Sequence, residues 1–279
     1  MPLSSITLIP KPPLLHYATP LFHQKNENTT MLTKSLIAAL LLAASAFAQA
    51  EDITVSAAAS LKEAFTDIAR QYEKQHPDAK IKLNTAASGT LLQQLAQGAP
   101  VDVLATADLA TMDKAAAQNL IQSNTRKTFA LNSLVLITPK NSSLKIAKPK
   151  DLLQSGVKRI AVGNPASVPA GAYTQAALEK QKLWSSLQPK IVQTQNVRQA
   201  LDYVIRSETE AGFVYRTDAA LKSHAVNIVA TIPTEKPVAY PIALTQSNKA
   251  ANEAQRFVNY VLSADGQTVL RRYGFSAAK

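Results

Sequence analysis

The sequence has 279 residues, of which 46% are hydrophobic and 18% charged, and it contains no cysteine. This composition is typical of a globular protein with a sizeable core, and it excludes collagen-like, wholly disordered and disulfide-dependent chains. Without thiols, a zinc–thiolate site, an iron–sulfur cluster and a cysteine nucleophile are excluded as well. The formal net charge of +11 favours anionic partners without naming one.

The amino-terminal end of the chain divides into two parts. Residues 31–50 place Lys34 before an apolar run and end in two Ala-x-Ala cleavage patterns, which predicts a secretory signal peptide that begins at Met31. A membrane anchor is the alternative, but the apolar run is short and charge resumes at Glu51. Residues 1–30 hold five of the 15 prolines and no periodicity, so we expect them to be an extension upstream of the true start. Because no cysteine is present for lipid attachment, we expect a periplasmic protein that is not anchored to the membrane.

The chain from residue 51 onward alternates short apolar runs with helical periodicities. In its first half these patterns predict strands at 53–57, 80–85, 101–104 and 133–138, and helices from Leu61 to the His76-Pro77 stop, at 91–97 and at 111–119. In its second half they predict strands at 159–162, 191–194, 212–215, 226–229 and 240–245, and helices at 173–181, 198–206 and 251–262.

Repeated alternation of strands and helices predicts an α/β protein with mainly parallel sheets. We expect two α/β lobes, because the pattern restarts after residue 140. The first lobe is predicted to comprise residues 51–132 together with 239–279, and the second residues 133–238. Two strands are then expected to cross between the lobes, near 131–138 and 236–244.

Most catalytic and cofactor motifs are missing from the sequence. None of the eight glycines belongs to a dinucleotide-binding, P-loop or nucleophile-elbow motif. From residue 51 onward the only histidines are His76 and His224, which are isolated and are interpreted as surface residues, so neither a transition-metal site nor a cofactor is expected. Asp102 and Asp108 are interpreted as capping and turn residues rather than as a catalytic pair. The basic stretch 145–159 lacks aromatic residues and is interpreted as a solvated loop, so nucleic acid is not expected as a partner.

Four predicted helix starts each follow a strand or a loop. They are Ser60, Ser88, the turn Ala170-Gly171, and Val197. The first turn of a helix leaves backbone N–H groups unpaired and carries a positive dipole end, so several such ends aimed at one point make an anion site. The alternative is that the serines are ordinary helix caps, which are common in α/β folds.

Nine stretches of the chain, taken in order, resemble the periplasmic molybdate-binding proteins that serve ABC transporters. The stretches are ITVSAAASL (53–61), NTAASGTLL (84–92), APVDVLATAD (99–108), NSLVLITP (132–139), AVGNPASVPAGAY (161–173), NVRQAL (196–201), GFVYRTDA (212–219), YPIAL (240–244) and RRYGF (271–275). The resemblance implies two α/β lobes joined by two crossing strands, as in type II periplasmic binding proteins, which close on an oxyanion about a hinge.

The resemblance also implies which residues hold the anion. It assigns hydrogen bonds from the hydroxyl groups of Ser60, Ser88 and Tyr215 and from the backbone N–H groups of Ala170 and Val197. All five would contact the oxygens of the anion and none would ligate its metal atom. These groups can all donate, which suits molybdate because it carries no proton at neutral pH, whereas protonated phosphate would benefit from an acceptor.

The expected function is therefore the capture of molybdate, and also tungstate, by a monomeric protein that delivers it to an inner-membrane ABC permease without catalysing a reaction. The same fold binding sulfate or another oxyanion stays open, because sulfate also carries no proton. A secreted hydrolase or phosphatase is the alternative from another class, although it would need a nucleophile with a base or a metal cluster. We also have expectations for the residues that follow Ser88 and Val197 in the sequence. Gly89 departs from a small polar residue expected in some members of the family, and the Arg198 side chain is expected to act only as a peripheral charge.

Overall fold

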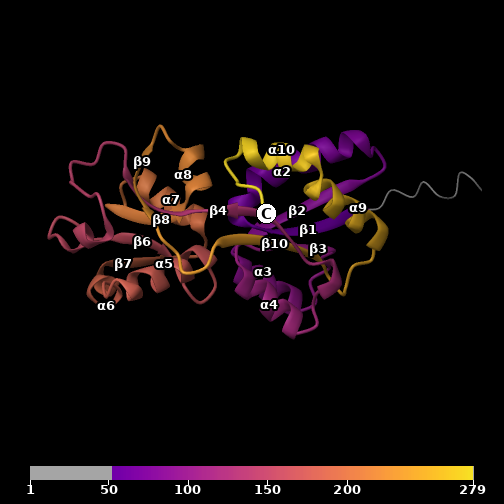
Figure 1. Ribbon diagram of the computed structural model, residues 1–279, viewed down its shortest axis with the longest axis horizontal. Helices are drawn as coiled ribbons and strands as arrows, with labels where there is room; N and C mark the ends of the chain where they lie inside the picture. Colours follow the sequence, from indigo (N-terminus) through magenta and orange to yellow (C-terminus); the bar gives the residue numbers. More distant parts are fainter. Residues whose placement is uncertain (1–51, 279) are drawn as a thin grey trace, which may run out of the picture. The chain divides into compact units, whose positions relative to one another are not determined.

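The computed structural model describes residues 52–278, which belong to one compact unit (Figure 1). The predicted extension at 1–30 and the predicted signal peptide at 31–50 lie outside the described residues. Among the helices of the described part, none is long and apolar enough to cross a membrane.

The first sheet has five strands in the order β2-β1-β3-β10-β4. These strands are β1 (Asp52–Ala58), β2 (Lys80–Ala86), β3 (Val103–Ala105), β4 (Lys127–Asn132) and β10 (Val238–Leu244). Strand β1 pairs in parallel with β2 and β3, whereas β10 is antiparallel to β3 and β4. Figure 1 shows helices on both faces of this sheet. One face carries α2 (Lys62–Gln75), α9 (Ala251–Leu262) and α10 (Ala264–Arg272), and the other carries α3 (Ser88–Ala96) and α4 (Leu109–Ala117). We call this sheet with its helices the first lobe.

The second sheet also has five strands, in the order β7-β6-β8-β5-β9. These strands are β5 (Leu134–Pro139), β6 (Ile160–Gly163), β7 (Ile191–Thr194), β8 (Ala211–Tyr215) and β9 (Val226–Ile232). Strand β6 is parallel to β7 and β8, and β5 is antiparallel to β8 and β9. Its helices are α5 (Pro169–Lys180), α6 (Trp184–Leu187), α7 (Val197–Ile205) and α8 (Arg216–Leu221). We call this sheet with its helices the second lobe.

The expected α/β class with two lobes is confirmed, and each sheet is mixed. Each sheet has two parallel and two antiparallel strand pairs, so the sheets are not mainly parallel as expected, because the crossing segments bring β10 and β5 in from the opposite direction. The chain passes from the first lobe to the second at Ser133, between β4 and β5, and returns between β9 and β10. Strand β10 therefore runs against β3, and β5 runs against β8.

Two elements of the first lobe were not expected from the sequence. Strand β4 begins with two exposed residues, Lys127 and Thr128, and lies at the edge of the sheet, so its apolar pattern covers only a few positions. Helix α10 begins at a serine cap, since the Ser263 hydroxyl accepts a hydrogen bond from the Gly266 N–H at 3.3 Å. Such a cap is a local signal that sequence reasoning could have used.

An aromatic cluster joins the helices of the first lobe to its sheet. The rings of Phe65 on α2 and Phe129 on β4 have centroids 5.7 Å apart, and Phe257 on α9 lies 6.3 Å from Phe65. All three side chains are buried. Tilted and edge-on aromatic pairs of this kind add to the stabilisation that comes from buried area alone.

The carboxyl-terminal end of the described chain is fastened to β4. The N–H of Leu131 donates to the carbonyl of Ser276 at 2.8 Å, and the N–H of Ser276 donates to the carbonyl of Leu131 at 3.0 Å. Because Leu131 directly precedes the first crossing segment, the end of the chain is tied to the point where the two lobes connect.

Candidate anion-binding site

The carboxyl ends of parallel strands deliver the candidate residues in both lobes. In the first lobe, Ser60 follows β1 and Ser88 follows β2. In the second lobe, Ala170 follows β6, Val197 follows β7, and Tyr215 is the last residue of β8. Parallel strands end at the same edge of a sheet, which is where α/β folds bind ligands. Each lobe therefore presents its set of candidate residues along one edge.

All five residues line one small cavity, where about 200 Å³ of space, including the part open to solvent, is not filled by atoms. Its other lining residues are small or apolar: Ala58, Ala59, Ala87, Ala107, Val168 and Pro169. Among the lining residues, all of them in the described part of the chain, none is acidic. Ser60 is 3% exposed, Ser88 is fully buried and Tyr215 is 1% exposed, so these three side chains have almost no contact with solvent.

Helix α7 offers an unpaired backbone N–H to the cavity. The side chain of Asn196 caps this helix by accepting from the N–H groups of Arg198 and Gln199, both at 3.0 Å. The N–H of Val197 has no hydrogen-bond partner within residues 52–278. A cap that satisfies the second and third donors thus leaves the first one, at the positive end of the helix dipole, available to an acceptor in the cavity.

Helix α5 also begins with an unpaired backbone N–H, for a different reason. Its first residue is Pro169, which has no N–H, and the N–H groups of Gly171 and Ala172 donate to the carbonyl of Val168 at 2.9 and 3.1 Å. Between them, the N–H of Ala170 has no partner among the described residues. Both backbone donors that the sequence indicated are therefore free to bind an anion.

The two serine hydroxyls are held by neighbours inside the first lobe. Ser60 lies in a 3-10 turn, Ala59–Leu61, that leads into α2, so it does not directly precede an α-helix as its sequence position suggested. Its Oγ is 2.9 Å from the Tyr240 Oη. The Oγ of Ser88, the first residue of α3, accepts a hydrogen bond from the N–H of Ala107 at 3.0 Å. That bond leaves the Ser88 hydrogen available for another acceptor.

Tyr215 completes the ring of donors from the second lobe. Its hydroxyl donates to the carbonyl of Ala107 in the first lobe at 3.3 Å, which is a long hydrogen bond. Burial raises the pKa of Tyr215 well above its usual value of 10, so the phenol keeps its hydrogen at neutral pH. An anion in the cavity would offer this hydroxyl a stronger acceptor than the Ala107 carbonyl.

Arg198 contradicts the expectation that it is a peripheral charge. Its side chain is 18% exposed and spans the two lobes. One guanidinium nitrogen lies 2.5 Å from a carboxylate oxygen of Glu63 on α2, and the same nitrogen donates to the carbonyl of Ser60 at 3.3 Å. The Nε lies 2.7 Å from the Oδ1 of Asp218 on α8, as an ion pair in which the N–H does not point along the line to the oxygen. The side chain turns to these carboxylates because the helix start directs its N–H groups, not its side chains, toward the cavity.

Asp218 is a fully buried carboxylate next to this site. Burial raises its pKa to about 6, while the Arg198 charge and a hydrogen bond from the N–H of Tyr215 act in the opposite direction. The group therefore depends on Arg198 for the compensation of its charge at neutral pH.

Gly89 and Ser167 bring the two lobes into backbone contact. The N–H of Gly89 donates to the carbonyl of Ser167 at 2.9 Å. A Cβ at position 89 would lie 2.7 Å from that carbonyl oxygen and 2.8 Å from the Ser167 Cα, closer than real Cβ atoms come. Glycine at 89 thus permits an approach that the small polar residue expected in some relatives would hinder.

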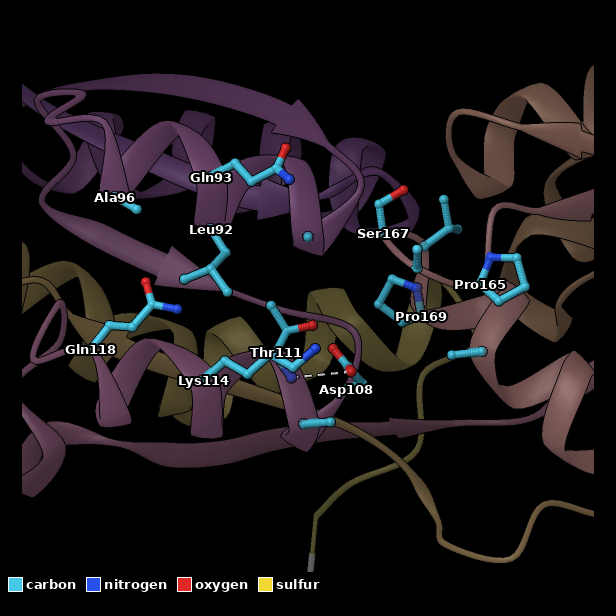
Figure 2. A pocket seen from close by; sticks show the side chains of 15 residues that line it. Leu92, Gln93, Ala96, Asp108, Thr111, Lys114, Gln118, Pro165, Ser167 and Pro169 are labelled. Atoms are coloured by element: carbon cyan, nitrogen blue, oxygen red, sulfur yellow. Dashed lines mark hydrogen bonds between the residues drawn. The ribbon is translucent and has the colours of Figure 1, made fainter.

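A wider groove adjoins this contact (Figure 2). Helices α3 and α4 form one side of it and the segment from Pro165 to Pro169 forms the other, around about 830 Å³ of space. Asp108 caps α4 by accepting from the N–H of Thr111 at 3.2 Å, as the sequence interpretation held. Its second carboxylate oxygen has no partner among the described residues, and burial raises its pKa.

The other polar residues singled out from the sequence do not join the cavity. Asp102 accepts from the backbone N–H groups of Thr54 at 2.8 Å and Lys249 at 3.0 Å, so it fastens loops. His76 stacks on Tyr72 with ring centroids 4.4 Å apart, and His224 is exposed. Within the described residues no group of three metal-ligating side chains comes together.

The fold and the site define a two-lobed α/β protein with a small cavity, lined by hydrogen-bond donors, to which both lobes contribute. The chain belongs to the family of bacterial extracellular solute-binding proteins, which it matches over residues 53–276. It is 38% identical over 243 residues to the molybdate-binding protein ModA of Escherichia coli, covering 84% of this chain and 93% of that protein. It is 37% identical over 254 residues to the ModA of Haemophilus influenzae, covering 89% of this chain and 98% of the relative. The solved periplasmic molybdate-binding protein of Azotobacter vinelandii shares the fold, with a TM-score of 0.72 at 23% identity over 81% of this chain and all of that one.

Proposed function

We propose that this protein binds molybdate in the cavity between its lobes and delivers it to an ABC permease of the inner membrane. The observation that carries the proposal is a cavity that presents five hydrogen-bond donors and no acidic side chain among its lining residues. The donors come from both lobes, so a bound anion stabilises the closed arrangement by the contacts that only this arrangement provides.

The chemistry of the cavity suits an anion that has charge to neutralise and no proton to donate. Hydrogen bonds to an ionised group are stronger than those between neutral groups, and buried charge needs such partners. Molybdate and tungstate are doubly charged tetrahedral oxyanions without a proton at neutral pH, so we include tungstate in the proposal. Sulfate meets the same electrostatic requirement, so it is the similarity to molybdate-binding relatives that favours molybdate in the proposal.

The proposal includes the place and state of the protein. Residues 31–50 have the pattern of a signal peptide, and the matched family is extracellular, which together support export to the periplasm. We expect a freely diffusing monomer whose mature chain starts at Gln49 or Glu51. Intact-mass analysis of the periplasmic fraction would contradict this if residues 1–30 were retained.

Calorimetric titration with molybdate, tungstate, sulfate and phosphate tests the proposed ligand directly. We expect saturable binding of molybdate and tungstate and much weaker binding of phosphate. Phosphate binding as tight as that of molybdate, or no saturable molybdate binding, would refute the proposal, and tighter binding of sulfate would replace molybdate with the alternative anion. A thermal-shift panel gives an independent reading, since a ligand at a hundredfold excess over Kd adds about 2.7 kcal/mol of stability.

Truncation of the donors tests the site. Ser60→Ala, Ser88→Ala and Tyr215→Phe should each weaken molybdate binding by about tenfold or more, because a hydrogen bond to a charged group contributes about 1.5–3 kcal/mol and 1.4 kcal/mol is one decade. Tyr203→Phe is the matched control, since the Tyr203 hydroxyl accepts only a 3.3 Å bond from Gln199 on the same helix. If the control weakens binding as much as the site variants do, the cavity is not the binding site.

A further inference from the structure

Hydrogen bonds connect three polar side chains in series, from the first crossing segment to the cavity. The Nδ2 of Asn132, the last residue of β4, lies 3.2 Å from the Oη of Tyr240 on β10. The Tyr240 Oη in turn lies 2.9 Å from the Oγ of Ser60. Asn132 and Tyr240 do not line the cavity, so their hydrogen-bonding groups reach a bound anion through Ser60.

The side-chain amide of Asn132 determines which groups donate and which accept in these hydrogen bonds. The backbone N–H of Ser133 donates to the Asn132 Oδ1 at 2.8 Å. The side-chain amide therefore turns its NH₂ group the other way, where it donates to the Tyr240 Oη and to the Thr217 Oγ1, the latter at 2.9 Å. A flipped amide would set NH₂ against the Ser133 N–H, so the network admits only one orientation.

The amide orientation of Asn132 in turn determines where the hydroxyl hydrogen of Tyr240 points, and Tyr240 is fully buried. Its oxygen accepts from Asn132, and within residues 52–278 the one remaining partner for its own hydrogen is the Ser60 Oγ. If Ser60 donated to Tyr240 instead, the phenol hydrogen would be left buried without an acceptor, which is unfavourable. Burial also raises the pKa of Tyr240 well above 10, so this hydrogen is retained.

We infer that Asn132 and Tyr240 are positioning residues that make the Ser60 hydroxyl a donor to the bound anion and so favour oxyanions that carry no proton. This inference rests on the proposed function and extends it to specificity. Tyr240 occupies the Ser60 oxygen, and the Ser60 hydrogen is left for the cavity. Ser88 is set in the same way, because the Ala107 N–H occupies its oxygen. A protonated oxyanion would need an acceptor in the cavity, whereas both hydroxyls turn their hydrogen toward it and already have one of their two lone pairs occupied.

The substitution Asn132→Asp reverses the donor–acceptor direction of these hydrogen bonds, while the side chain at 132 keeps nearly the same shape. A carboxylate at 132 accepts from Tyr240, so Tyr240 turns its hydrogen away from Ser60, and the Ser60 hydroxyl then donates to Tyr240. A lone pair of Ser60 would face the anion in place of a hydrogen. We expect molybdate binding to weaken by at least tenfold. The matched control is Asn84→Asp, because the Asn84 amide also donates to a serine, the Ser56 Oγ at 3.1 Å, and neither residue lines the cavity.

A new negative charge near the site would also weaken anion binding, and a double variant separates the two causes. Tyr240→Phe alone frees Ser60 to turn its hydrogen toward the anion, so we expect a loss of less than about fivefold. Adding Tyr240→Phe to Asn132→Asp removes the reversed hydrogen bonds but keeps the charge. If the inference holds, the double variant binds molybdate at least fivefold better than Asn132→Asp alone, a coupling that a double-mutant cycle measures. A double variant that binds no better than Asn132→Asp overturns it.

The selectivity of the variants gives a second readout that a purely structural role would not change. In Asn132→Asp the Ser60 oxygen can accept from a protonated anion, so the preference for molybdate over phosphate should fall by at least tenfold, as measured by competitive displacement at pH 7. Loss of both affinities by the same factor overturns the inference. Urea unfolding of each variant confirms that it is folded. If the unsubstituted protein does not bind molybdate, the proposed function fails; if it binds molybdate and the variants show no reversal, only this inference fails.

Discussion

Replacing Arg198 with glutamine should destabilise the protein by an amount that depends on pH. The substitution removes the positive charge that lies 2.7 Å from the fully buried carboxylate of Asp218. Removal of one partner from a buried ion pair typically costs about 3–5 kcal/mol, and because Arg198 itself is partly exposed we expect a loss of about 3 kcal/mol at pH 8. The Glu63 carboxylate, which is 39% exposed, can be solvated by water and adds little.

The pH dependence follows from the pKa of Asp218. With Arg198 present, burial already raises this pKa from 3.8 to about 6, and loss of the arginine raises it further. A carboxyl group whose pKa is higher in the folded state than in the unfolded state binds a proton more tightly when folded, so its contribution to stability falls as pH rises through that window. In Arg198→Gln the deficit should therefore be large at pH 8 and much smaller at pH 5, where folded Asp218 is protonated and neutral.

Urea unfolding at pH 5 and pH 8 measures the loss of stability in Arg198→Gln and its dependence on pH. Arg206→Gln serves as the control, because Arg206 is 61% exposed and its 3.5 Å pair with Glu208 lies at the surface, so we expect a change within about 0.5 kcal/mol at both pH values. Adding Asp218→Asn to Arg198→Gln should recover most of the loss at pH 8. A deficit of equal size at both pH values, or one below about 0.5 kcal/mol at pH 8, would refute the role assigned to the buried carboxylate.

Two further predictions concern closure of the lobes. Glu63→Gln removes the charged partner of Arg198 in the first lobe and leaves its hydrogen bond to the Ser60 carbonyl. Since the pair is partly exposed, we expect molybdate binding to weaken by about two- to fivefold with little change in unfolding free energy; an unchanged Kd at both low and moderate salt would show that the pair does not assist closure. Gly89→Ala places a methyl group 2.7 Å from the Ser167 carbonyl oxygen, and overpacking of this kind costs about 1–3 kcal/mol, so calorimetry should show molybdate binding weakened by a factor between about 5 and about 140. Small-angle scattering should show the radius of gyration falling when the unsubstituted protein binds molybdate but falling less in Gly89→Ala, and equal changes in both would contradict this account.

Local patterns in the sequence indicated four of the five cavity residues as helix starts, and the family resemblance added Tyr215. A strand followed by a helix start is recognisable from neighbouring residues, and the structure places Ser60, Ser88, Ala170, Val197 and Tyr215 along one cavity because the strands before them share the edges of two sheets. The α/β class followed from the same alternation. The binding role of these residues stays a prediction until the titrations are made.

Contacts between residues far apart in the chain could not be predicted in this way. Arg198 and Glu63 are separated by 135 positions, and nothing in the sequence near either one specifies the other. Asn132 and Tyr240 lie 108 positions apart on the two segments that connect the lobes. The mixed character of the sheets has the same origin, since the direction in which β10 re-enters the first sheet is decided by the return of the chain and not by its own residues. Periodicity describes one element at a time, whereas these features depend on how elements meet.

The pairing of Ser276 with Leu131 determines where this protein tolerates an attached reporter. Leu131 is followed at once by Asn132 and by the passage into the second lobe, so anything fused beyond Lys279 begins within a few residues of the hinge. If the lobes close as proposed, a bulky carboxyl-terminal fusion would pull on the strand next to the crossing segment and would disturb an affinity measurement. A small environment-sensitive dye at the same end would instead experience each opening and closing, which makes the carboxyl terminus a practical position for an optical sensor of the bound anion.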